Sequence, residues 1–468
     1  MTLKEKAKEN PGFQYIIDNL EIISSTARQH LLNQPFRTSP TDILTEHDNI
    51  DAAVAILNDP TNGKSISVLR HQFMQLHDLS GSIQSLRRKV VLDEVELFEI
   101  KQLAHITAIA RREVETIGLA HRIDMPDTTP IFQLLDPDRT SIPTFYIYDS
   151  YDTRLTPIRR ELKALQVNPD TTENASRLAA LFDAQQSIQQ EVLLGLTERL
   201  SAYAETIQQA EDQMAYCDIL FAKAQQVQDL SLHRPTLSNS ETHFKALFNP
   251  RLRQRKEALK LRYQPVDISL GSGTCIITGA NMAGKTVLLK SISVAQLMTQ
   301  FGMFVPAEES TVALVDDVLL CIGDEQNEMN GLSSFASEII KISDTLTRSK
   351  NEKLLILIDE PARTTNPIEG QAIVHSIASI LNERSSFTLL TTHYSQLKVD
   401  CRRLRVKGFV EDLTTLPLTP STINQFMDYS LLEETQEEVP HEALRIASIL
   451  GCDGEMIEQS LQYLEEEN

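Results

Sequence analysis

The sequence predicts an α/β domain preceded by a mainly helical region. In the first 240 residues, apolar side chains recur at three- and four-residue steps, which places them on one face of a helix. From about residue 260 the apolar residues instead form short, nearly unbroken runs that are rich in β-branched side chains. Helical stretches separate these runs, as in a buried parallel sheet. A chain of 468 residues has room for about three structural units of roughly 150 residues each.

The longest helical pattern lies between Pro169 and Pro235, where Gly195 is the one glycine or proline. We expect a helix or a pair of helices here, forming a rod tens of ångströms long at about 1.5 Å per residue. A stripe of this kind usually packs against another helix, so we interpret the segment as a lever or arm. Its apolar positions are 178, 181, 182, 188, 192, 196, 200, 203 and 207.

The segment before the lever reads differently. TFYIYDS (144–150) is rich in β-branched and aromatic residues and predicts a short strand. PIRRELKAL (157–165) then starts the long helix, with Pro157 suited to its first turn.

Three apolar runs define the predicted sheet: CIIT (275–278), LLILID (354–359) and FTLLTTH (387–393). Helical stretches at 287–300 and 370–383 lie between them. Alternating strands and helices favour an α/β domain whose ligands bind at the carboxyl ends of the strands. The tail from 439 to 468 predicts one or two further helices.

Composition restricts the compartment and the partners. No apolar run reaches the roughly 18 residues that span a bilayer. The first residues lack the apolar core of a secretion signal. The five cysteines form no CxxC pair. We therefore expect a cytoplasmic protein without a membrane partner. The 44 Lys and Arg residues face 65 Asp and Glu, a formal net charge of −21. A surface this acidic repels nucleic acid unless it carries a local basic patch.

One motif predicts a nucleotide site. In CIITGANMAGKTVLLK (275–290) a strand leads into a loop with the spacing Gly, four residues, Gly-Lys-Thr, and a helix follows. Backbone N–H groups of such a loop and of the helix N-terminus point at phosphates. Lys285 can reach the β- and γ-phosphates, and the Thr286 hydroxyl can coordinate Mg²⁺. The residues predicted to contact ATP in this loop are Gly279, Ala280, Asn281, Met282, Ala283, Gly284, Lys285 and Thr286.

Two further strand ends supply candidate catalytic groups. LLILIDEP (354–361) places Asp359 where it can hold Mg²⁺, and Glu360 where it can polarise the attacking water as a general base. TTHYSQL (391–397) places His393 beyond another strand, where it can sense the γ-phosphate. A solvated acidic pair and a structural histidine are the competing interpretations.

A fourth segment, CIGDEQNEMNGLSSFASEI (321–339), contains Gly331, Ser333 and Ser334 just before a predicted helix. Exposed donors at a helix N-terminus can receive an anion, but they can equally form a plain N-cap. On spacing alone the two interpretations are even.

Together these motifs carry a resemblance to a known family. GANMAGKT, IGDEQNEMNGLSSF, LIDEPARTTNPIEG and TTHYSQL, in this order and spacing, resemble the ATPase domain of the MutS family, a branch of the ABC-type P-loop ATPases. GKTVLLK, IGDEQ and TTHYSQLK are closer to the second bacterial MutS branch than to the mismatch-repair enzyme. Weaker similarity to the family's core, lever and C-terminal helices extends over 148–162, 217–224 and 439–451.

The resemblance implies three parts: a helical core and lever (1–240), a P-loop ATPase domain (241–410) and a C-terminal helical dimerisation segment (411–468). It implies a homodimer, or a heterodimer with a related MutS-like subunit, with ATP and Mg²⁺ as cofactors. Asn281 and Lys285 would contact the phosphates of one chain's ATP, while Ser333 would approach the γ-phosphate of the partner's ATP.

Some residues depart from the family pattern. Ala280 replaces a proline, Ala283 replaces a glycine, and PART (361–364) replaces a glycine-rich sequence. None of these removes a catalytic group, so we expect hydrolysis to be retained. Arg363 and Thr365 lie where the family has a loop that communicates between the two ATP sites of a dimer. The departure at 361–364 therefore bears on the coupling between those sites rather than on hydrolysis.

The client of the ATPase stays open between two classes. Family membership favours mismatched or branched DNA. The acidic charge favours a protein client. So does the short stretch between Arg159 and Asp218, which we expect to leave no room for the family's clamp. We also expect the chain to start at the core, without a mismatch-reading domain. MutS-like proteins of that kind are associated with reactivating cobalamin-dependent aminomutases. One basic stretch, RLRQRKEALKLR (251–262), could contact phosphates or form a solvated helical face, and nearby Tyr263 could stack on adenine.

Overall fold

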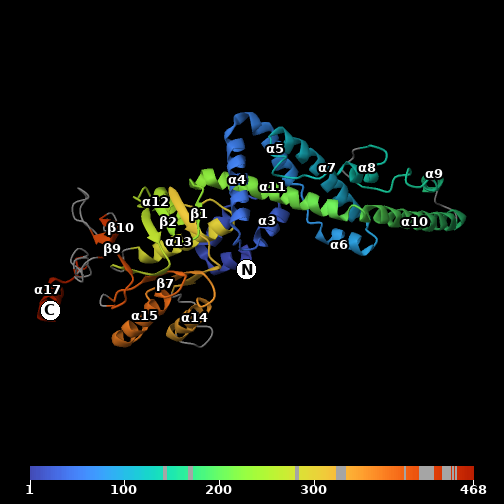
Figure 1. The fold of residues 1–468 in the computed structure, drawn as a ribbon. Coiled ribbons are helices and arrows are strands. Elements are labelled where there is room, and N and C mark those ends of the chain that lie inside the picture. Colours follow the sequence, from blue (N-terminus) through green and yellow to red (C-terminus); the bar gives the residue numbers. More distant parts are fainter. Residues whose placement is uncertain are drawn as a thin grey trace. The chain divides into compact units, whose positions relative to one another are not determined.

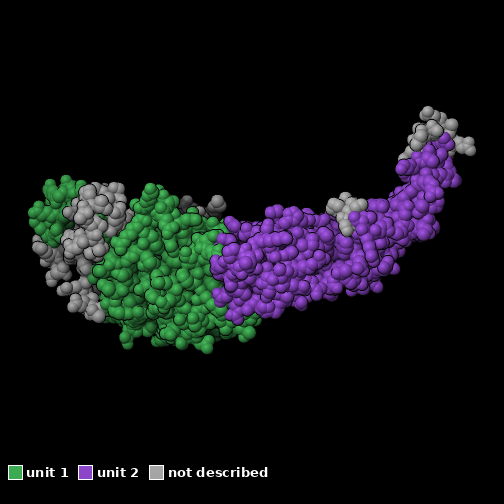
Figure 2. Space-filling view, turned by 90° about the horizontal axis from the view of Figure 1, so that it is seen from above, with its two compact units in different colours: residues 1–19, 35–47, 226–468 green, residues 20–34, 48–225 purple. Residues whose placement is uncertain are grey.

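A computed structural model of the chain describes residues 1–140, 145–166, 172–279, 284–322, 334–394, 397–409, 426–434, 444, 447 and 451–467. These residues form two compact units, coloured separately in Figure 2. Unit 1 contains residues 1–19, 35–47 and 226–468, and unit 2 contains residues 20–34 and 48–225. The chain therefore passes from one unit to the other after residues 19, 34, 47 and 225. The sequence instead predicts the first domain boundary after residue 240. No helix among the described residues is long and apolar enough to cross a membrane.

Unit 2 is helical in its described part, which confirms the predicted helical region. Two helices, α4 (Pro40–Asn58) and α11 (Ala204–Leu230), have residues assigned to both units, with 40–47 and 226–230 in unit 1. The other helices are α3 (Ser25–Leu32), η1 (Pro60–Asn62), α5 (Gly63–Phe73), α6 (Ser80–Arg88), α7 (Glu94–Thr116), α8 (Thr129–Leu135), α9 (Leu155–Gln166) and α10 (Thr172–Ser201).

The predicted lever is a pair of helices, α10 and α11, separated by residues 202 and 203. The apolar stripe is largely buried, as predicted, with Leu196, Leu200 and Ile207 at 2% exposure or less. Phe182 is an exception at 48% exposure. It is adjacent in sequence to the buried Leu181, so the two side chains point in different directions around the helix.

The helix that starts near Pro157 is not continuous with the lever, so that prediction is wrong. Helix α9 ends at Gln166 and runs antiparallel to α10. Two ion pairs show this direction: Glu161, in the middle of α9, lies 2.8 Å from Arg177 (Oε1 to Nε), and Arg154, just before α9, lies 2.5 Å from Glu191 (Nη2 to Oε2).

The strand predicted at 144–150 is also wrong: residues 145–150 form no strand, and Thr144 lies outside the described residues. A strand needs a neighbour for its backbone hydrogen bonds, and the described part of this unit contains only helices. The apolar pattern instead reflects burial of Tyr148, whose hydroxyl lies 3.1 Å from Asp136 Oδ1 and 3.2 Å from Lys101 Nζ.

Unit 1 contains the predicted α/β domain. Its six-stranded sheet has the order β10-β9-β4-β8-β7-β6, in which β10 is antiparallel to β9 and the other neighbours are parallel. The strands are β4 (Gly273–Thr278), β6 (Asp317–Cys321), β7 (Leu354–Asp359), β8 (Phe387–Thr391), β9 (Arg402–Phe409) and β10 (Met427–Glu433).

Helices cover both faces of this sheet, which explains why the strands read as unbroken apolar runs. In β7, Ile356 packs with α14 (Ser334–Arg348) and α15 (Pro367–Asn382), and the alternate residues Leu355 and Leu357 are equally buried. Helix α13 (Lys285–Gln300) contacts β7 and β6 and lies on the face opposite α14 and α15 (Figure 1).

Strand β10 corrects one prediction. The sequence assigns 411–468 to a helical segment, but residues 427–433 extend the sheet beyond β9. Arg402 at the start of β9 and Glu433 at the end of β10 form an ion pair of 2.5 Å across the two strands. Helix α17 (Gly454–Glu467) is the described helix of the tail.

A second, four-stranded sheet has the order β1-β5-β2-β3. Its strands are β1 (Thr236–Ser238), β2 (Thr242–Leu247), β3 (Val266–Leu270) and β5 (Glu309–Ala313), and β2 and β3 flank α12 (Pro250–Ala258) along the chain. The N-terminal helices α1 (Leu3–Glu9) and α2 (Pro11–Asp18) belong to the same unit, where Asn10 Nδ2 donates to Ser293 Oγ of α13 at 2.7 Å.

Candidate functional site

The phosphate-loop motif lies between strand β4 and helix α13, as its sequence predicts. Gly279 and Gly284 flank the loop with φ of 137° and 76°, a backbone region that favours glycine. Lys285 is the first residue of α13, and its Nζ donates to Gly279 O at 2.6 Å. The predicted contacts at Ala280, Asn281, Met282 and Ala283 lie outside the described residues, as does Ser333.

Asp359 lies at the carboxyl end of β7 and accepts two hydroxyl hydrogen bonds. Thr286 Oγ1 donates to its Oδ2 at 2.6 Å, and Thr391 Oγ1 donates to its Oδ1 at 2.6 Å. Thr391 ends the neighbouring strand β8, in register with Asp359. Thr391 was not predicted as a functional residue, although its position at the end of the FTLLT run was a usable signal.

Glu360 follows Asp359 and is oriented by an unusual backbone. Its φ is 45°, a conformation that costs a non-glycine residue of order 1 kcal/mol. Its N–H donates to the carbonyl and hydroxyl oxygens of Thr391, at 3.1 and 3.0 Å. The carboxylate lies 3.2 Å from Lys285 Nζ and 3.5 Å from Arg363 Nη1. The fold thus holds the lysine of the loop beside the candidate general base.

The oxygen atoms of Thr286 and Asp359 converge in a way that suits a hard cation. Mg²⁺ prefers oxygen ligands and usually takes one or two from protein, with water and phosphate supplying the rest. A hydroxyl and a carboxylate 2.6 Å apart match that donor set. Mg²⁺ bound there would neutralise charge on the β- and γ-phosphates.

Comparison with known proteins identifies this fold and motif set. Residues 275–461 match the family model described as MutS domain V. Over these residues the chain is similar to proteins of the MutS family. The predicted resemblance is therefore confirmed.

Curated relatives of the MutS family carry two names. Endonuclease MutS2 of Caldanaerobacter subterraneus subsp. tengcongensis is 33% identical over 282 residues, which are 58% of this chain and 33% of that protein. Endonuclease MutS2 of Leuconostoc mesenteroides is 29% identical over 369 residues, 73% of this chain and 44% of that protein. The DNA mismatch repair protein MutS of Thermus thermophilus is 28% identical over 348 residues, 69% of this chain and 41% of that protein. The aligned part of the chain spans less than half the length of each relative.

His393, the candidate γ-phosphate sensor of this MutS domain, follows β8 and is exposed. Its ring packs against Tyr394, with 4.2 Å between the ring centroids. Among the described residues, no hydrogen bond or ion pair joins His393 to Lys285 or Glu360. The structure therefore places His393 near the predicted strand end without bringing it into the cluster.

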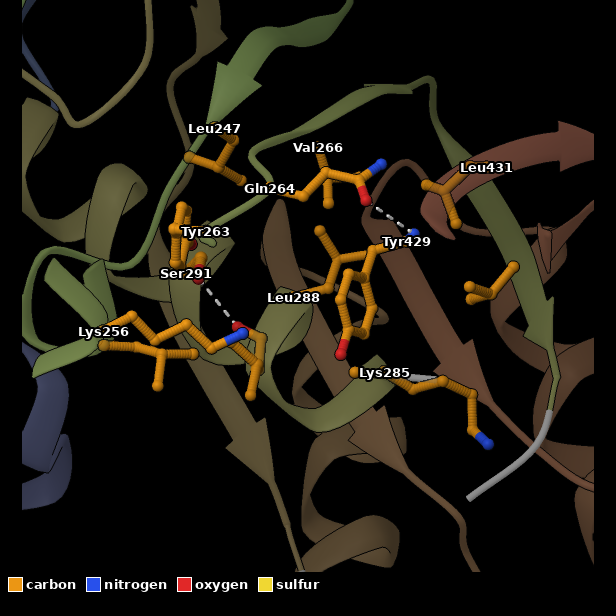
Figure 3. Close-up of a pocket in the computed structure, with 14 residues that line it drawn as sticks. Leu247, Lys256, Tyr263, Gln264, Val266, Lys285, Leu288, Ser291, Tyr429 and Leu431 are labelled. Carbon is orange, nitrogen blue, oxygen red and sulfur yellow. Dashed lines mark hydrogen bonds between the residues drawn. The ribbon is translucent and has the colours of Figure 1, made fainter. Parts of the chain in front are cut away.

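A cavity of about 250 Å³ adjoins the phosphate loop of the MutS domain. Gly284 and Lys285 form one end, and Tyr263 and Tyr429 contribute aromatic rings (Figure 3). The Tyr429 ring lies 3.1 Å from where a Cβ on Gly284 would stand, so this glycine permits the close approach. The remaining lining residues are Leu247, Leu252, Lys256, Gln264, Val266, Val287, Leu288, Ser291, Val406 and Leu431.

Tyr263 was predicted for base stacking, whereas no sequence motif marks Tyr429 or Lys256 for the base. Tyr429 lies on β10, far along the chain from the loop, and only the pairing of β10 with β9 brings it there. Burial raises the pKa of both tyrosine hydroxyls, so the rings stay neutral at physiological pH. An apolar cavity with aromatic rings beside a phosphate loop is suited to a nucleotide base.

Proposed function

We propose that this chain binds ATP with Mg²⁺ and hydrolyses it. The observation that carries the proposal is the cluster of Lys285, Thr286, Asp359 and Glu360 at one edge of the sheet, next to a cavity of base size. Lys285 would move from Glu360 to the phosphates, and Glu360 would then accept a proton from the attacking water.

Two substitutions test this assignment. We expect Glu360→Gln to bind ATP with the parent affinity and to lower the turnover rate by about 100-fold or more, because a general base is removed. We expect Lys285→Ala to lose ATP affinity itself. Glu383→Gln, an exposed residue just after α15, serves as the matched control. Unchanged turnover in Glu360→Gln, measured as phosphate release, would show that the cluster is not catalytic.

The client of the ATPase is proposed to be mismatched or branched DNA. The names of the relatives, endonuclease and DNA mismatch repair protein, support DNA. A local basic surface also supports it: Arg255 and Arg262 are exposed and have no ion pair among the described residues, whereas Arg253 is paired with Glu257 at 2.8 Å. This surface can attract phosphates despite the net charge of −21.

Fluorescence anisotropy with a four-way junction and a matched duplex tests this assignment. Arg255→Glu/Arg262→Glu should weaken binding to both DNAs and reduce the salt dependence by about one unit of slope per lost phosphate contact. Lys341→Glu/Lys350→Glu, which reverses two exposed lysines elsewhere in unit 1, should bind as the parent does. An ATPase-active chain that binds neither DNA at low salt would instead support the protein client, such as a cobalamin-dependent aminomutase, which the acidic charge favours.

A further inference from the structure

The cavity beside the phosphate loop contains two lysines with different surroundings. Lys285 stands at the phosphate end and is ion-paired with Glu360 at 3.2 Å. Lys256 extends from α12 into the aromatic end (Figure 3). Its Nζ lies 5.9 Å from the ring centroid of Tyr263 and 5.7 Å from that of Tyr429, within the range of weak cation–π contact.

The Lys256 ammonium has no hydrogen-bond acceptor and no carboxylate partner among the described residues. Burial alone lowers its pKa, with no charged neighbour contributing. An ammonium carries three N–H donors, and withdrawing them from water without acceptors is unfavourable. A ligand that offers an acceptor at this point would restore the missing hydrogen bond.

Two other polar side chains of the cavity, Gln264 and Ser291, are already engaged. Gln264 Nε2 donates to Asp428 Oδ1 at 2.8 Å, and its Oε1 accepts from the Tyr429 N–H at 3.3 Å. Ser291 Oγ donates to Val287 O at 2.8 Å. Lys256 is therefore the cationic side chain at the aromatic end of the cavity, and its N–H donors can serve a ligand.

The position of Lys256 is built into α12. Asn249 caps the helix by accepting from the Leu252 N–H at 3.0 Å, and Pro250 occupies the first turn. The Asn249 N–H donates to the Tyr263 hydroxyl at 2.7 Å, which ties the chain after α12 to the start of the helix. Lys256 and Tyr263 are thus held on the same side of the cavity.

We propose that Lys256 determines base specificity by donating a hydrogen bond to a ring nitrogen of a purine that lies against Tyr263 and Tyr429. The inference rests on the proposed nucleotide-binding function. Purine rings offer the acceptors N1, N3 and N7, and a charged donor to one of them is stronger than a neutral one. The rings supply stacking area, and the ammonium fixes which edge of the base faces α12.

Deaza analogues of ATP, in which one ring nitrogen becomes C–H, test the contact atom by atom. Dissociation constants for ATP and its 1-, 3- and 7-deaza analogues are measured for the parent chain, Lys256→Met and Lys256→Arg, with Lys260→Met as an exposed control. The parent should bind one analogue about tenfold more weakly than ATP. Lys256→Met should bind ATP with that weaker affinity and lose nothing further with the same analogue. Lys256→Arg should restore the discrimination, and Lys260→Met should match the parent.

Three results would overturn the inference. Equal ATP affinity in the parent and Lys256→Met would show that Lys256 contributes nothing. Equal losses for all analogues in Lys256→Met would show contact with the ribose or a phosphate rather than with the base. Failure of the folded parent to bind ATP would remove the proposed function along with the inference, whereas the first two results leave ATP binding intact.

Discussion

Glu211, a buried carboxylate of the helical unit, contributes a pH dependence of stability. Glu211 on α11 is 1% exposed, and its Oε1 accepts from the Leu79 N–H at 2.8 Å. Burial raises the pKa of Glu211 to about 7, above the usual value of 4.5 for a glutamate. The folded state therefore favours the protonated form, so this stabilisation is present below pH 4.5 and is lost as the pH rises to about 7.

We expect Glu211→Gln to be more stable than the parent at pH 8 and to flatten the decline in stability between pH 5 and pH 8. The glutamine keeps the acceptor for Leu79 but carries no charge. At about 1.4 kcal/mol per pKa unit, the gain is of order 3 kcal/mol at most. Thermal unfolding across this pH range measures it, with exposed Glu198→Gln on α10 as the control. A parallel decline in the parent and Glu211→Gln would exclude Glu211 as the source.

At the same scale, the sequence predicts the phosphate end of the site better than the base end. Lys285 and Thr286 adjoin in one motif, and Asp359 follows a strand, so parallel-strand topology is enough to bring them together. Lys256 and Tyr429 belong to no motif. Their proximity depends on the angle at which α12 leaves β2 and on the pairing of β10, which local patterns do not encode.

At the scale of elements, helix α1 is tied to the sheet by a buried charge cluster. Lys6 Nζ lies 2.5 Å from Asp317 Oδ1 at the start of β6, and the two side chains are 5% and 2% exposed. Arg348 at the end of α14 pairs with the other carboxylate oxygen at 2.9 Å. This cluster explains why the first residues of the chain belong to the sheet unit rather than to the helical one.

We expect Lys6→Met to destabilise unit 1 by about 3 kcal/mol, because it leaves a buried carboxylate short of one partner. Lys6→Met/Asp317→Leu should recover part of this loss, since it removes both buried charges. Exposed Lys4→Met should leave stability unchanged. Hydrogen exchange of the β6 amides is the measurement, and equal protection in Lys6→Met and the parent would mean that the ion pair does not hold α1.

The sequence predicts a strand correctly where both faces of the strand are buried, because every side chain is then apolar. Strand-like composition alone is not sufficient. LLILID is apolar on both faces and forms β7, whereas TFYIYDS has strand composition but no neighbour to pair with. Strand β9, RRLRVKGF, was not predicted, although Leu404 and Val406 alternate with charged residues in the pattern of a half-buried strand.

At the scale of the whole molecule, the predicted ATP site draws on two chains. Lys285, Thr286, Asp359 and Glu360 come from one chain and lie together. The family resemblance assigns a further group, Ser333, to the γ-phosphate of a partner chain. Ser333 lies outside the described residues, so a functional test has to decide.

Mixing two inactive variants provides that test. In a symmetric dimer with shared sites, Lys285→Ala disables the site of its own loop, and Ser333→Ala disables the site of its partner's loop. An equimolar mixture forms heterodimers in about half of the pairs, each with one intact site, so phosphate release should recover to about a quarter of the parent rate. Lys285→Ala mixed with Glu360→Gln should not recover, because those two residues lie 3.2 Å apart in the same half-site. If the first mixture stays inactive although mass spectrometry shows mixed dimers, Ser333 does not act across the interface.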